Sequence, residues 1–187
     1  MKRYSDEQLI IRFLKGDEES LEILIKRYLK PIYSFAFRFV GNSQEAQDLA
    51  QDVFVKVWRN LKRFDRNKKF KTWIFAITKN ACLDWRKKKR AIPFSELEHV
   101  DDGKSFIENI PDTHLLPNEL LERIDVANFL NKALEKLSTK YRMVLLLRYN
   151  DHFTFREIAE VLGEPLNTIK SRHRRGIAVL RELLREK

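Results

Sequence analysis

The chain has 187 residues, 43% of them hydrophobic, with only five glycines and five prolines. This length suits one domain or two small ones, and the composition predicts an all-α protein rather than a loop-rich β protein. A single cysteine, Cys82, excludes an internal disulfide and a cysteine-based zinc cluster. Because the N-terminus lacks a signal-peptide core and no apolar run reaches spanning length, we expect a cytoplasmic protein without direct membrane insertion.

The net charge of +10 is divided into segments along the chain. Residues 86–90 are all basic, and residues 167–187 carry seven cations against two acids. Between them, residues 95–125 hold nine acids against two cations. Because a merely solvated surface does not require such segmentation, the pattern favours a nucleic-acid partner.

The first predicted helices have clear ends. Ser5 and Gln8 have the spacing of a capping box that opens a short helix, and Gly16 closes it. Asp17 is a candidate cap for a second helix that runs to Gly41 and that Pro31 should kink.

A third helix is predicted near residues 44–62, opened by Ser43. Its broad apolar face is expected to lie in the core, and its members are Ala46, Leu49, Ala50, Val53, Phe54, Val57, Trp58 and Leu61. The opposite stripe carries Asp48, Asp52, Val55 and Arg59. A lone exposed valine is common on a solvated face, but the stripe slightly favours a partner-binding surface.

A polar, basic loop over residues 63–69 leads to a fourth helix, near 70–90, that ends in the basic run. Lysines and arginines here alternate with aromatic residues, a pattern that suits single-stranded or distorted nucleic acid. The helical phase of Trp73 and Trp85 nevertheless places both on the core face. We therefore interpret them as structural first, with at most a role at the rim of a site.

Periodicity is lost after Pro93, and the acidic stretch 93–118 is predicted to be a linker. It divides the chain into a first module, residues 1–92, and a second module, residues 119–187. In the second module Thr154 and Glu157 form another capping box, and Gly163 ends the helix that they open.

The last two helices have the layout of a helix-turn-helix DNA reader. The final helix turns Ile169 and its periodic partners inward, and we expect His173 to be packed rather than to read bases or bind metal. The outward residues able to bond bases or phosphates are Asn167, Lys170, Ser171, Arg174 and Arg175. The alternative is a basic amphipathic helix that lies on an acidic partner.

Both modules resemble the sigma factors of bacterial RNA polymerase. Residues 46–54 (AQDLAQDVF) resemble the helix that binds core polymerase, and residues 70–80 (FKTWIFAITKN) resemble the adjoining promoter-melting segment. Residues 137–142, 155–159 and 167–172 resemble the promoter-binding C-terminal domain. Since only these two domains are found, the chain is similar to the extracytoplasmic-function (ECF) group.

The resemblance implies partners for each surface. The stripe would dock on the clamp helices of the polymerase's largest subunit; its residues are Asp48, Gln51, Asp52, Val55 and Arg59. Phe64 and Asn80 would hold a flipped-out base of the −10 element, and the backbone nearby would be held by Lys71, Lys79, Arg86, Lys87 and Lys88. The −35 element would be contacted by Asn167, Thr168, Lys170, Ser171, Arg172, Arg174 and Arg175. The resemblance also implies that the protein contacts the flap of the polymerase's second subunit and that its linker is threaded through the polymerase. It further implies an anti-sigma factor as a partner.

Two other classes of protein fit the sequence less well. A stand-alone helix-turn-helix regulator needs a sensor or dimerisation domain, and residues 1–92 show no ligand-pocket signature. A nucleic-acid enzyme needs clustered carboxylates or a metal site, but Asp48 and Asp52 are turned outward and the four histidines lack ligand spacing. We therefore expect no catalytic residue, metal, cofactor or small-molecule substrate.

Overall fold

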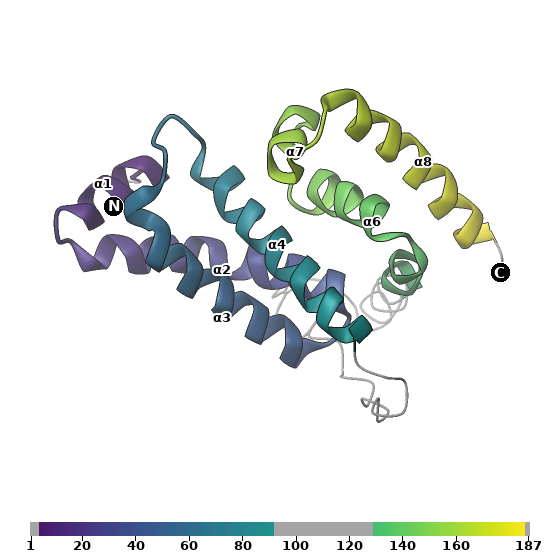
Figure 1. Ribbon diagram of the computed structural model, residues 1–187, viewed down its shortest axis with the longest axis horizontal. Helices are drawn as coiled ribbons and strands as arrows, with labels where there is room; N and C mark the ends of the chain where they lie inside the picture. The colour runs from purple at the N-terminus through teal and green to yellow at the C-terminus, as the bar shows by residue number, and fades with distance from the viewer. Residues whose placement is uncertain (1–3, 92–128, 186–187) are drawn as a thin grey trace, which may run out of the picture.

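A computed structural model describes residues 4–91 and 129–185, and within them all regular structure is helical (Figure 1). The all-α prediction is confirmed. The first module contains α1 (Asp6–Leu14), α2 (Glu18–Val40), α3 (Ser43–Asn60), the 3₁₀ turn η1 (Leu61–Arg63) and α4 (Phe70–Ala91). The second contains a helical segment over 129–136, α6 (Thr139–Leu145), the π-helical turn η3 (Leu146–Asn150), α7 (Phe155–Leu162) and α8 (Leu166–Arg185). The predicted linker lies outside the described residues.

The helix boundaries follow the local capping chemistry. The capping boxes Ser5–Gln8 and Thr154–Glu157 are both formed, and Gly41 ends α2 in the left-handed conformation at φ 79°. Pro31 does not end α2. The cap of α3 differs from the prediction, because Asn42 rather than Ser43 accepts the backbone N–H of Glu45.

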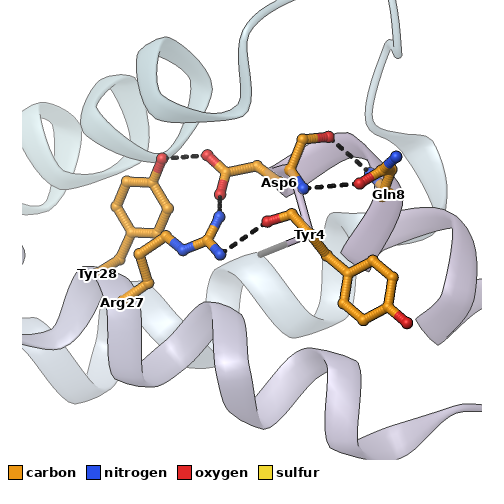
Figure 2. A network of polar contacts seen from close by, with 6 residues as sticks. Tyr4, Asp6, Gln8, Arg27 and Tyr28 are labelled. Carbon is orange, nitrogen blue, oxygen red and sulfur yellow. Dashed lines mark hydrogen bonds and ion pairs between the residues drawn. The ribbon is translucent and has the colours of Figure 1, made fainter. Parts of the chain in front are cut away.

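Polar contacts around Asp6 hold α1 against α2 (Figure 2). Its carboxylate accepts hydrogen bonds from the Arg27 guanidinium and the Tyr28 hydroxyl. A second guanidinium nitrogen of Arg27 donates to the Tyr4 carbonyl at 2.9 Å. Burial, with the bond to Asp6, raises the pKa of Tyr28 well above its usual range, so the phenol stays a donor. The first helix is thereby tied to the bundle.

The core of the first module lies between α2, α3 and α4. On α3, the predicted apolar face is buried at Ala46, Leu49, Ala50, Val53 and Val57. Trp58 contradicts the prediction, because 59% of it is exposed. It lies one residue beyond Val57, at the edge of the apolar arc, and a helix packed on α2 and α4 buries only the middle of so wide an arc.

In the second module α8 crosses α6 closely at Gly176. A Cβ atom added there would lie 3.2 Å from the Tyr141 Cβ, which is tighter than ordinary contact. Gly176 therefore allows the two helices to approach closely, because any side chain there would force its neighbours to shift. Packing on α6 and α7 leaves the opposite face of α8 outward.

The two modules also pack against each other, principally through α4 and α7 (Figure 1). Their buried residues form one continuous hydrophobic cluster, which includes Phe75 of α4 and Phe153 before α7.

Candidate nucleic-acid interface

A surface hollow of about 380 Å³ lies where the end of α3 and η1 meet α4. Its lining residues are Lys56, Asn60, Arg63, Trp73, Ile77 and Asn80. The half-buried Trp73 ring and Ile77 supply apolar contact, two amides supply donors and acceptors, and two cations flank them. This combination fits an unstacked base with its phosphates, because the ring face, the base edge and the backbone each find a partner.

The two residues predicted to hold a base have different positions. Asn80 is exposed and lines the hollow. Phe64 is only 7% exposed, and its ring packs edge-on against Phe70 and 5.1 Å from the ring of Trp73. In this arrangement the Phe64 ring is therefore buried and fills the core behind Trp73. Trp73 presents the aromatic surface instead.

Three residues of the hollow, Lys56, Asn60 and Arg63, were not singled out from the sequence. They follow one another at spacings of four and three, so they continue one polar helical face into the basic loop. This spacing is the pattern in the sequence that could have identified the three residues.

The cations predicted to bind the DNA backbone also differ from one another in exposure and in their contacts. Lys87 and Lys88 are exposed, and Lys79 and Arg86 are half-buried along α4. Lys71 instead donates to the Asp151 carbonyl of the second module, with an Nζ–O distance of 2.6 Å. In this arrangement Lys71 is therefore directed to the protein's own second module.

The predicted docking stripe of α3 lies on the surface. Asp48, Gln51, Asp52, Val55 and Arg59 are all exposed, Val55 to 43%. The exposed Trp58 lies beside them in sequence and adds apolar area that the prediction had assigned to the core. The stripe therefore combines exposed charged residues with two exposed apolar side chains, Val55 and Trp58.

The outward face of α8 carries the predicted DNA-contacting residues. Asn167, Lys170, Arg174 and Arg175 are exposed, and Thr168 and Ser171 are half-buried. Arg172 differs, because its guanidinium is paired with Glu164 at 2.6 Å and its side chain is 22% exposed. The structure thus brings four exposed side chains together and turns Arg172 toward the helix-turn-helix turn.

His173 is half-buried, as predicted. Its Nε2 is 2.9 Å from the Tyr149 hydroxyl, and its ring packs edge-on against Phe155. Burial and the nearby Arg148 lower the pKa of His173, so the neutral imidazole is favoured. It positions α8 on the module.

Among residues 4–91 and 129–185, no group of three or more His, Cys, Asp or Glu residues is arranged to hold a metal ion. In the same ranges no helix has the length and apolar character needed to span a bilayer. Cys82 is fully buried, and burial raises the pKa of its thiol to about 12.

Comparison with known proteins gives matches to both modules. The family model of Sigma-70 region 2 matches residues 24–92, and that of Sigma-70, region 4, matches residues 130–180. The ECF RNA polymerase sigma factor SigW of Bacillus subtilis is 33% identical over 173 residues, covering 92% of each chain. The ECF sigma-E factor of Escherichia coli K12 is 27% identical over 177 residues, covering 91% of this chain and 90% of the relative.

Two solved structures have folds similar to that of this chain. CnrH, in complex with the cytosolic domain of CnrY, superposes with a TM-score of 0.69 at 25% identity, covering 96% of both chains. RpoE of Bartonella quintana, in complex with the anti-sigma factor NepR, has a TM-score of 0.67 at 26% identity, covering 89% of this chain and 97% of RpoE.

Two helical modules that match Sigma-70 regions 2 and 4 define a transcription initiation factor. The chain belongs to the sigma-70 family of RNA polymerase sigma factors, in its ECF group, and is a promoter-recognition subunit of bacterial RNA polymerase.

Proposed function

We propose that the first module binds core polymerase through α3 and captures one base of the −10 element's non-template strand in the hollow. The hollow carries this proposal, because it joins the Trp73 ring to the Asn80 amide and to cations on α3 and η1. Flipping a base out of the stack costs a few kcal/mol, and stacking on an aromatic ring returns roughly 1–3 kcal/mol. Lys79, Arg86, Lys87 and Lys88 hold the flanking phosphates along α4.

The second module reads the −35 element as duplex through α8. Lys170, Arg174 and Arg175 are exposed on one helix face, and arginine and lysine are suited to guanine edges and phosphates in a major groove. Asn167, Thr168 and Ser171 supply shorter polar side chains at the same end. Arg172 acts indirectly, because its guanidinium donates to Glu164 in the turn before α8 and holds that residue in place.

Polymerase itself is bound by the α3 stripe, on the clamp helices of the largest subunit, and by the second module on the flap of the second subunit. Charged residues around Val55 and Trp58 give a rim around an apolar centre. The protein has no catalytic site of its own and acts in the cytoplasm, where polymerase works. An anti-sigma factor binds it, as NepR binds RpoE of Bartonella quintana in their solved complex.

In vitro transcription with core polymerase on a randomised promoter library tests the base-capture role. Asn80→Ala should relax sequence preference at one −10 position and lower open-complex formation, whereas Asn67→Ala should leave both unchanged. Asn67 is a matched control because it is an exposed asparagine in the adjacent loop, outside the hollow. An unchanged −10 profile for Asn80→Ala contradicts the role of the hollow.

A further inference from the structure

A second hollow, of about 300 Å³, lies where the second module meets the C-terminal part of α2. Its walls come from the helical segment over 129–136, from α6 and η3, and from α8, which lies beside α6 (Figure 1). None of the side chains assigned above to DNA or to the α3 stripe lines it. Most of the lining is aliphatic and consists of Leu130, Leu134, Leu145, Leu146, Ile177 and Leu180.

Three polar side chains complete the lining, namely Arg38, Tyr149 and Asn150. Arg38 and Asn150 lie at the same end, because both act on the buried carboxyl of Asp151. Asn150 donates to that carboxyl at 3.1 Å, and Arg38 acts on it through its charge. Tyr149 is 58% exposed and lies at the rim. The hollow therefore has an apolar body and one end that offers a cation and an amide.

The guanidinium of Arg38 has only a partial counter-charge. Arg38 is half-buried, and within residues 4–91 and 129–185 it forms no ion pair and no hydrogen bond. Burial raises the carboxyl pKa of its charged neighbour Asp151 to about 7, so that group is only about half ionised at neutral pH. A half-buried cation is stabilised by an anion that also accepts its hydrogen bonds. A carboxylate in the hollow would supply both.

The size of the hollow favours a small ligand over a helix of a partner protein. One turn of a helix, about 10 Å across and about 5.4 Å long, occupies roughly 400 Å³. At roughly 30 Å³ for each carbon or oxygen with its hydrogens, the share of a water molecule in the liquid, the hollow of about 300 Å³ holds about ten such atoms. A single alkyl chain fits this space.

We propose that this hollow binds a medium-chain carboxylate, an alkanoic acid of about eight to ten carbons, with its carboxylate on Arg38 and Asn150 and its chain against the leucines. An apolar cavity with a few placed polar groups is the usual form of a small-molecule site. The site does not depend on the −10 and −35 roles proposed above. Because Arg38 belongs to the first module and the other lining residues to the second, the ligand contacts both modules.

A series of straight-chain carboxylates tests the size of the site in the full chain. Titration calorimetry with hexanoate, octanoate and decanoate, each below its micelle concentration, should show affinity rising by up to about fourfold for each added methylene. The rise should stop near decanoate, where the hollow is filled, so tetradecanoate should bind no better. An affinity that keeps rising through tetradecanoate indicates adsorption to general apolar surface and overturns the site. Failure of every member to bind also overturns it.

Substitution of Arg38 tests the position of the carboxylate. Octanoate should bind Arg38→Gln about tenfold more weakly than the unchanged protein, whereas octanol, which has no charge, should lose much less. Arg38→Lys should recover part of the affinity. Lys30→Gln is the matched control, because it removes one exposed cation from the same helix outside the hollow. An equal loss in Lys30→Gln would show that net charge alone attracts the ligand, and would overturn the assignment.

Photolabelling locates the ligand in the unchanged protein, so it decides the question even if Arg38→Gln fails to fold. A decanoate that carries a diazirine in its chain should label peptides that contain residues 145–150 and 177–180, and excess decanoate should remove the label. The hollow at Trp73 and Ile77 is the internal comparison. Labelling at that hollow instead, or labelling that decanoate does not displace, overturns the proposal.

Discussion

The ring of Phe64 packs behind that of Trp73, with 5.1 Å between their centroids, and only Trp73 reaches the hollow. If Phe64 acts by packing, its size matters more than its aromatic face. Phe64→Ala should lower the free energy of unfolding by about 3–5 kcal/mol, whereas Phe64→Leu should cost less and retain promoter opening. Urea unfolding and open-complex assays measure the two effects. Loss of promoter opening in a stably folded Phe64→Leu protein would argue for direct base contact.

Arg174 and Lys88 should contribute to DNA binding in different ways. Arg174→Ala should lower transcription in a manner that depends on the −35 sequence, because we propose that this exposed arginine of α8 reads base edges. Lys88→Ala should weaken binding to most sequences and reduce the salt dependence by about one phosphate contact. Promoter-library profiles and salt titrations of the holoenzyme measure this, and identical profiles for the two variants would refute the division.

Much of this arrangement was predictable from local pattern. The capping boxes, the inward face of α8 and the exposure of Asp48, Asp52 and Val55 all follow from spacing within one helix. Those features depend on neighbours three or four residues away, which the sequence shows directly.

Other features depend on partners far away along the chain. A helical wheel places Trp58 with the apolar residues, but burial stops where the contact with α2 and α4 ends. Phe64 is turned inward by the aromatic cluster of α4, and Lys71 is directed to Asp151, 80 residues later. No periodicity in one helix predicts such contacts, because they arise from how the modules pack.

The α3 stripe should be needed for assembly but not for folding. Asp52→Arg reverses an exposed charge and should abolish binding to core polymerase, with the helical circular-dichroism signal and the unfolding midpoint unchanged. Glu19→Arg makes the same change of charge on the first turn of α2 and should assemble normally. Native gel shifts with core enzyme compare the two. Undiminished assembly by Asp52→Arg would rule out the stripe as the docking surface.

Asp151 should make the packing of the two modules on each other, here called the closed state, depend on pH. Burial raises its carboxyl pKa to about 7, one oxygen accepts from Asn150, and Lys71 and Arg38 of the first module lower the pKa only in part. When the modules separate, the carboxyl gains water and its pKa falls toward about 4. The closed state therefore binds the proton more tightly. Its stabilisation from this group is complete at low pH and is lost as the pH rises through about 7.

Cross-linking of the thiols of Lys68→Cys and Glu160→Cys, two exposed positions beside the Lys69–Glu157 ion pair, measures this dependence if the linked fraction is corrected for the reactivity of free thiols at each pH. Between about pH 4 and about pH 7 the closing equilibrium should fall, by at most about tenfold for each pH unit, and above pH 7 it should level off. Asp151→Asn cannot ionise, so it should keep the protein closed and remove the dependence. A pH profile that persists unchanged in Asp151→Asn would assign the effect to another group.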